Sequence, residues 1–200
     1  MFFSDLSLEE IVYRVIAVLV ALTVHEFAHG FAAFSLGDPT AQRQGRLSLN
    51  PLRHLDPVGT LLILIVGFGW AKPVEINPRN YRNPRRDMAI VGGAGPLTNI
   101  VVGMLLGWLL LPLTGAGAVQ TLVFTVILIN IYLGVFNLIP IPPLDGSRVV
   151  GPFLPDPLFR SYMQLERYGI FILIAILLVA APVLIAIINP VVNALLNIAI

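Results

Sequence analysis

The sequence predicts an all-α polytopic membrane protein with about four spanning helices. Of its 200 residues, 57% are hydrophobic and only 12% are charged, about half the charged share of a typical soluble domain. Apolar segments of the length that crosses a bilayer recur along the chain, with short polar stretches between them. The sequence has no internal repeat, low-complexity tract or soluble domain, so we expect residues 1–200 to form a single membrane domain.

The first spanning helix is expected over residues 8–36. Ser7 is a suitable N-cap, and Glu9 and Glu10 place negative charge in the first turn, where the helix dipole favours it. The sequence Gly37-Asp38-Pro39 is a clear helix terminator. The apolar stretch between these signals is long enough to cross the hydrocarbon core.

Three further spans are expected over residues 88–112, 118–139 and 169–188. The run Pro140-Ile141-Pro142-Pro143 cannot continue a helix, so it ends the third span. Pro182 predicts a kink in the fourth, and a weakly defined apolar tail is expected after Pro190.

The polar stretches predict smaller elements at the membrane surface. Segment 58–70 is apolar but too short to cross, so we expect a short or re-entrant helix there. Alternation at residues 46–49 and the composition of residues 71–76 predict small membrane-associated β-strands.

Basic residues predict the orientation in the membrane. Most of the lysines and arginines lie in stretches 40–57, 71–87 and 144–167, which we therefore expect to face the cytoplasm. Both termini would then lie outside, provided that segment 58–70 does not cross. The run Arg82, Arg85 and Arg86 is interpreted as a topology signal that contacts lipid headgroups.

Composition also excludes several classes of site. The chain has no cysteine, so disulfides and thiolate metal ligands are excluded. A net charge of +1 gives no support to nucleic-acid binding. A metal site in this chain therefore uses no thiolate ligand.

The first predicted span contains the metal-binding pattern H-E-x-x-H, as His25-Glu26-Phe27-Ala28-His29. On a helix, side chains four residues apart share one face, so both imidazoles can reach one metal ion. Glu26 lies beside them and can take a proton from an activated water. Polar side chains in a spanning helix are costly without a partner or a function. The alternative is a set of buried polar residues that bond to neighbouring helices.

Two histidines do not complete a catalytic zinc site, which usually has three protein ligands. His54 is the only other histidine and lies in a polar loop, where it is either a loop or capping residue or a ligand. Asp145 follows a proline-rich extended stretch that can return a carboxylate to the bundle, and Gly146 permits a tight turn. Asp145 is equally suited to capping the next helix. Its residue chemistry alone leaves both interpretations open.

Three motifs together resemble the site-2 protease family of intramembrane zinc metalloproteases. They are the histidine motif at 25–29, the Gly95-Pro96-Leu97-Thr98-Asn99 stretch, and Asn137-Leu138-Ile139-Pro140 running into Leu144-Asp145-Gly146. The resemblance covers nearly the whole chain and indicates the compact subgroup without PDZ or CBS domains. It implies that Asp145 is the third ligand, with His25 and His29, of one Zn²⁺ ion. It also implies that Asn137 lines the site, where its amide could hold the substrate carbonyl or the oxyanion; the alternative is a helix-packing contact.

The predicted activity is regulated intramembrane proteolysis. Zinc-activated water would hydrolyse peptide bonds within or near the transmembrane segments of single-span substrates, with Glu26 as the general base. We expect an integral protein of a prokaryotic cell membrane, with the active site nearer the cytoplasmic face. A metal-ion carrier and an inactive scaffold are the alternatives. Glu26 discriminates against the carrier, because transport needs no base at that spacing.

The stretch from Phe68 to Val74 has two interpretations. The family resemblance suggests a membrane-associated hairpin, and an extended strand with a free edge could pair with an unwound substrate. Alternatively, it is a structural turn with Trp70 anchored at the lipid interface.

Overall fold

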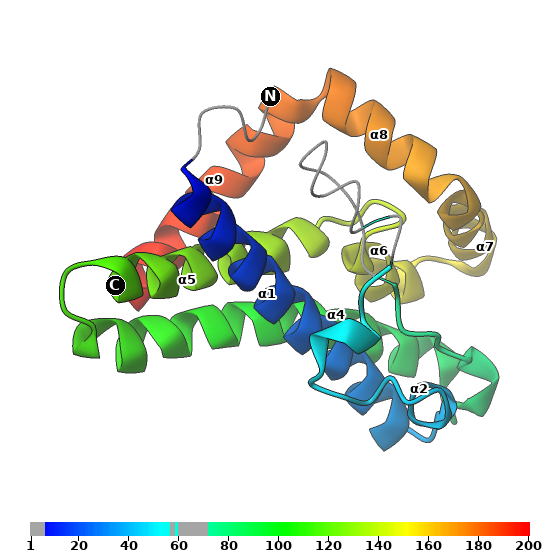
Figure 1. Cartoon of the computed structure of the whole chain (residues 1–200). Helices are drawn as coiled ribbons and strands as arrows, with labels where there is room; N and C mark the ends of the chain where they lie inside the picture. The colour runs from blue at the N-terminus through cyan, green and yellow to red at the C-terminus, as the bar shows by residue number, and fades with distance from the viewer. Residues whose placement is uncertain (1–6, 57–58, 60–71) are drawn as a thin grey trace.

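Three long helices pack against one another and form the centre of the protein (Figure 1). This computed structural model describes residues 7–56, 59 and 72–200. Helix α1 (Leu8–Ser35) crosses α4 (Pro84–Leu105) and α5 (Ala118–Asn137), and each of the three contacts the other two. Ser7 caps α1 as predicted, with Glu10 completing a reciprocal capping box.

Shorter elements connect and flank this centre. Helix α4 continues through a π-helical turn, η3 (Leu106–Leu110), and a 3-10 turn, η4 (Leu111–Leu113). The other helical elements are α2 (Thr40–Arg43), η1 (Pro51–Arg53), η2 (Pro78–Asn80), α6 (Asp145–Val150), η5 (Gly151–Phe153), α7 (Asp156–Gln164), η6 (Leu165–Tyr168), α8 (Gly169–Val179) and α9 (Ala181–Ala199).

Four helices in the described part of the chain are long and apolar enough to span a membrane, as predicted. They cover Leu8–Ser35, Pro84–Leu113, Ala118–Asn137 and Ala181–Ala199. The first three agree with the predicted spans to within a few residues. Many large apolar side chains point outward, among them Phe171, Leu178 and Val179. In a bilayer these side chains contact lipid. Apart from Gly59, the predicted helix at 58–70 lies outside the described residues.

The predicted fourth span over residues 169–188 is wrong in its boundaries. The helix is interrupted at Ala180, which separates the 11-residue α8 from the 19-residue α9. Pro182 does not kink a helix but lies in the first turn of α9, where its missing N–H is not needed. The predicted tail beyond Pro190 is part of α9, which continues to Ala199.

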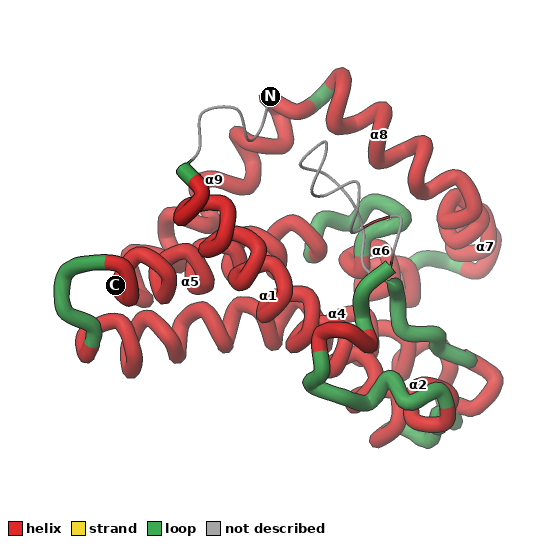
Figure 2. The backbone as a smooth tube through the Cα atoms, viewed as in Figure 1, coloured by secondary structure: helices red, strands yellow, loops and turns green. Residues whose placement is uncertain are grey.

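The predicted β-strands are also wrong within the described residues (Figure 2). Residues 46–49 form a turn, in which the Ser48 N–H donates to the Arg46 carbonyl. Residues 72–77 are irregular, and Ala71 lies outside the described residues. Their N–H groups bond to scattered partners rather than to a neighbouring strand: Val74 donates to a side chain of α1, and Asn77 to Asp38. The composition of these residues predicted an extended backbone. It could not predict whether another strand would pair with them.

Apolar packing is concentrated between α5 and α9. Buried side chains of α5 meet those of α9 in one cluster, formed by Val123, Ile127, Ile131, Val135, Leu184, Ile188, Val192 and Ala199. This packing holds α5 against α9. Ile100 and Met104 of α4 pack against the same cluster, and α5 also contacts α1.

Asp38 fastens the segment before α4 to the end of α1. Its side chain is fully buried and accepts hydrogen bonds from Thr40, from the Asn77 N–H at 2.7 Å and from the Asn80 amide at 2.6 Å. Burial alone would raise the pKa of Asp38, but these hydrogen bonds outweigh it and lower the pKa below its ordinary value. The ionised carboxylate therefore ties residues 77–80 to α1.

We predict that Asp38→Ala lowers the free energy of unfolding by about 1–3 kcal/mol, because buried donors at Asn77 and Asn80 lose their acceptor. Thermal unfolding in detergent measures the loss. Asp156→Ala, which removes an exposed carboxylate paired with Arg85, should change stability by less than about 1 kcal/mol.

Wild type and Asp38→Ala also give a test by pH. Because the folded-state pKa of Asp38 is depressed, its stabilisation is fully present above the ordinary value of 3.8 and is lost as the pH falls through the folded value. The stability difference between wild type and Asp38→Ala should therefore shrink below about pH 4. A difference that stays constant or grows on acidification would contradict this account of Asp38.

Candidate metal centre

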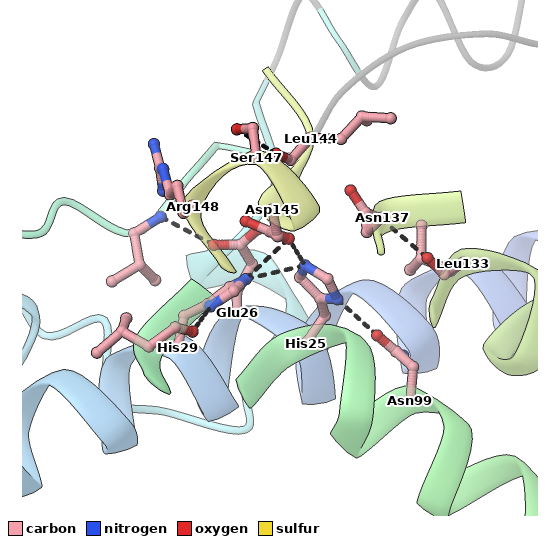
Figure 3. Close-up of polar contacts among 12 residues, drawn as sticks. His25, Glu26, His29, Asn99, Leu133, Asn137, Leu144, Asp145, Ser147 and Arg148 are labelled. Carbon is pink, nitrogen blue, oxygen red and sulfur yellow. Dashed lines mark hydrogen bonds and ion pairs between the residues drawn. The ribbon is translucent and has the colours of Figure 1, made fainter. Parts of the chain in front are cut away.

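His25, His29 and Asp145 meet at one point inside the helical bundle (Figure 3). The two histidines lie one turn apart on α1, both 5% exposed, and their Nε2 atoms are 3.0 Å apart. Asp145 Oδ2 lies 3.0 Å from His25 Nε2 and 3.2 Å from His29 Nε2. One atom of each side chain thus faces a common centre.

The chain brings Asp145 to the histidines by a tight return after α5. α5 ends at Asn137, and α6 begins at Asp145 without any side-chain cap hydrogen bond. A Cβ atom at Gly146 would lie 2.2 Å from the Leu138 carbonyl oxygen, so only glycine permits this approach. The Asp145 carboxylate therefore points at α1 and does not cap α6.

Hydrogen bonds at the far side of each ring determine where the histidine protons lie. His29 Nδ1 is 2.7 Å from the Val91 carbonyl oxygen, which can only accept, so this nitrogen carries the proton. His25 Nδ1 is 2.6 Å from Asn99 Oδ1. The Asn99 Nδ2 group donates to the Ala21 carbonyl at 2.9 Å, which assigns the oxygen to the side facing His25. Each neutral ring therefore presents an Nε2 lone pair to the centre.

Three lone pairs that face one another at 3.0–3.2 Å repel unless a positive charge lies between them. The separations are close to the roughly 3.3 Å expected between ligands of a tetrahedral zinc ion with bonds of about 2.0–2.1 Å. Two imidazole nitrogens and a carboxylate oxygen fit Zn²⁺ by number, chemistry and spacing.

Gly95 of α4 keeps this centre open. A Cβ atom at this position would lie 2.4 Å from His29 Nε2 and 2.8 Å from His25 Nε2. Any larger residue would thus occupy the space that the two nitrogens face.

Glu26 lies beside the histidines and is 8% exposed. Its Oε2 accepts a hydrogen bond of 2.8 Å from the Val74 N–H. Among the described residues, no hydrogen bond engages its other oxygen. One half of the carboxylate is held in place, and the other can accept a proton.

Comparisons with known proteins identify the family. Residues 112–180 match the model of peptidase family M50. The chain is 41% identical over 174 residues to the protein named "Putative zinc metalloprotease YwhC" of Bacillus subtilis (strain 168), covering 82% of this chain and 79% of that protein. The chain belongs to peptidase family M50. The resemblance to the site-2 proteases is thereby confirmed, and this M50 protein is a metalloprotease.

More distant relatives carry a similar name. "Putative zinc metalloprotease Rip2" of Mycolicibacterium smegmatis is 30% identical over 178 residues, which cover 82% of this chain and 65% of that protein. The Rip2 protein of Mycobacterium tuberculosis (strain H37Rv) is 31% identical over 178 residues, which cover 80% of this chain and 64% of that protein. No solved structure matches the chain.

Two other residues considered from the sequence bond to backbone carbonyls of the M50 protein rather than to the three clustered side chains. Asn137, the last residue of α5, is half-buried, and its Nδ2 donates to the Leu133 carbonyl at 3.0 Å (Figure 3). His54 is buried in the loop that follows η1, with Nε2 2.7 Å from the Ser48 carbonyl oxygen. His54 is not part of the histidine–aspartate group.

Sequence reasoning missed the groups that orient the centre. Asn99 belonged to a family motif but had no assigned role, and Asn130, which Asn99 contacts, was not noticed. Asn130 interrupts the apolar run of α5, and a polar residue in a spanning helix could have drawn attention to it. The backbone contacts of Val74 and Val91 have no sequence signal, because any residue supplies an N–H and a carbonyl.

We predict that Gly95→Ala weakens zinc binding more than about tenfold, because the added methyl group intrudes between the two Nε2 atoms. Chelator competition on the purified M50 protein in detergent measures the affinity. Gly93→Ala is the matched control on α4: its Cβ would make ordinary contacts of 3.7 Å with Leu97 and Val149. Equal zinc affinity in both variants would contradict the position of the metal.

Proposed function

We propose that this M50 protein hydrolyses peptide bonds within or near the transmembrane segments of membrane-anchored substrates. In this proposal His25, His29 and Asp145 hold one Zn²⁺ ion, and Glu26 is the general base. The observation that carries it is the convergence of three ligand atoms beside Glu26 in a bundle of apolar helices.

Zinc in this site supplies Lewis acidity, which polarises the scissile carbonyl and lowers the pKa of water. Glu26 takes the proton from the attacking water and passes it to the leaving amine. The Val74 N–H holds one carboxylate oxygen, so the other keeps a fixed direction for the proton transfer. His25 and His29 keep their Nδ1 protons throughout, because Asn99 and Val91 hold them.

Asn137 has a separate role in the proposal. Its Nδ2 carries two hydrogens, and the contact with the Leu133 carbonyl uses one. The second can donate to the substrate carbonyl oxygen and, as charge develops there, to the oxyanion. The position of Asn137 at the end of α5, where the chain turns toward Asp145, supports this role.

We place the protein in a prokaryotic cell membrane, with the active site nearer the cytoplasmic face. His25 and His29 lie in the second half of α1, toward the end from which the basic stretch 40–57 follows. Basic stretches remain on the cytoplasmic side. Water would reach the site from there, and a single-span substrate would enter from the lipid.

The direct test is cleavage of a single-span membrane protein by purified wild type and variants, with zinc quantified in each. Glu26→Gln should retain zinc and lose about 10²–10⁴-fold in rate, because the amide cannot accept the proton. Asp145→Ala should lose zinc and activity together. Glu9→Gln, the same change on an exposed turn of α1, is the control and should behave as wild type. Cleavage by Glu26→Gln at the wild-type rate would refute the assignment of Glu26 as the base.

Asn137→Ala should lower the rate constant of cleavage by about 10²–10³-fold and leave the zinc affinity unchanged, because the amide contacts the oxyanion and not the metal. Single-turnover cleavage and chelator competition measure the two quantities. Asn193→Ala, at an exposed position of α9, serves as the matched control. A loss of zinc without a loss in rate of the reloaded protein would contradict the oxyanion role.

A further inference from the structure

A chain of side-chain hydrogen bonds connects α5 to the metal centre through α4. Asn130 Oδ1 accepts from Asn99 Nδ2 at 2.9 Å, and Asn99 Oδ1 faces His25 Nδ1 at 2.6 Å. Both asparagines are fully buried, with 0% exposure. α5 carries none of the three proposed ligands, so these hydrogen bonds are the polar link between α5 and the ligands.

The backbone carbonyls of Val126 and Ala21 set the direction of these hydrogen bonds. Asn130 Nδ2 donates to the Val126 carbonyl at 2.8 Å, which turns the Asn130 oxygen toward Asn99. The two hydrogens of Asn99 Nδ2 are then taken by Asn130 and by the Ala21 carbonyl. Because carbonyl oxygens only accept, the amide of Asn99 has one orientation in which every partner is satisfied.

We propose that Asn99 and Asn130 are a positioning pair that fixes the tautomer and ring orientation of His25, Asn99 directly and Asn130 through Asn99. If the Asn99 amide turned over, its NH₂ group would face His25 Nδ1, and the proton of the ring would move to Nε2, where it blocks a metal. Asn130 opposes that rotation, because the turned amide would place two oxygens against each other. The inference rests on the proposed function in taking His25 as a zinc ligand.

Asn130 could instead be a helix-packing contact with no effect on the centre. Its bond to Val126 lies within its own helix and needs no partner on α4. The two roles differ in what happens when Asn99 is already removed: a positioning residue that acts through Asn99 has no further effect, whereas an independent packing contact keeps its own effect.

The test is a double-mutant cycle read out as zinc affinity by chelator competition in detergent. Asn99→Leu should weaken zinc binding about 10–100-fold, as removal of a group that orients a ligand does. Asn130→Leu should weaken zinc binding by about tenfold, the lower end of that range, because Asn130 contacts Asn99 and not His25 itself. The double variant should bind zinc as Asn99→Leu does. An additive loss in the double variant, or no loss in Asn130→Leu, overturns the proposal.

Further variants separate positioning from general damage. Asn130→Asp should retain near wild-type affinity, since a protonated carboxyl group can accept from Asn99 and donate to Val126. Asn130→Thr should lose affinity as Asn130→Leu does. Its hydroxyl can bond to Val126 but is too short to reach Asn99, and it keeps the test open if the leucine variant does not fold. Asn189→Leu removes the 3.0 Å bond between α9 and Tyr132 of α5 and should leave zinc affinity unchanged.

His25→Ala distinguishes failure of this inference from failure of the proposed function. Zinc affinity that does not depend on His25 overturns both. Zinc affinity that depends on His25 but not on Asn130 overturns only the positioning pair.

Discussion

The lone pairs of His25, His29 and Asp145 face one another at 3.0–3.2 Å inside an apolar bundle, an arrangement that is stable only with positive charge between them. The architecture around this centre follows from that requirement. α1 supplies two of the proposed ligands because one helical turn separates them, and α6 supplies the proposed third after a tight return at Gly146. α4 approaches at Gly95, where a side chain would fill the centre. Each nearby element therefore either contributes a ligand, orients one or leaves room for the metal.

The proposed base is held by a second, separate set of contacts. Glu26 shares α1 with the histidines, but the group that holds it is the Val74 N–H in an irregular segment before α4. That segment is in turn fastened to the end of α1 by Asp38 through Asn77 and Asn80. Asp38, which follows α1, thus helps to position the segment that holds Glu26. The contacts that hold the proposed ligands and those that hold the proposed base therefore involve different residues.

Hydropathy and motif spacing were sufficient to predict the first three spans, the metal-binding pattern on α1 and the candidacy of Asp145. They failed where the outcome depends on partners distant in sequence. Residues 169–188 are apolar throughout, and Pro182 was interpreted as a kink within one helix rather than as the first turn of a new helix after Ala180. Within the described residues the predicted strands have no neighbouring strand: the N–H groups of Ser48, Val74 and Asn77 bond to a turn carbonyl and to side chains. Asn130 shows the same limit within the site: its sequence position marks it as unusual, but only the packing of α5 against α4 reveals that it touches Asn99.

X-ray absorption at the zinc edge of the purified protein in detergent tests the central claim most directly. The account predicts one zinc per chain, with nitrogen and oxygen neighbours at about 2.0–2.1 Å and the multiple-scattering signature of two imidazoles. His29→Ala should reduce that signature to one imidazole. A wild-type spectrum without two imidazoles, or one that His29→Ala leaves unchanged, would contradict the claim that the two histidines of α1 hold the metal.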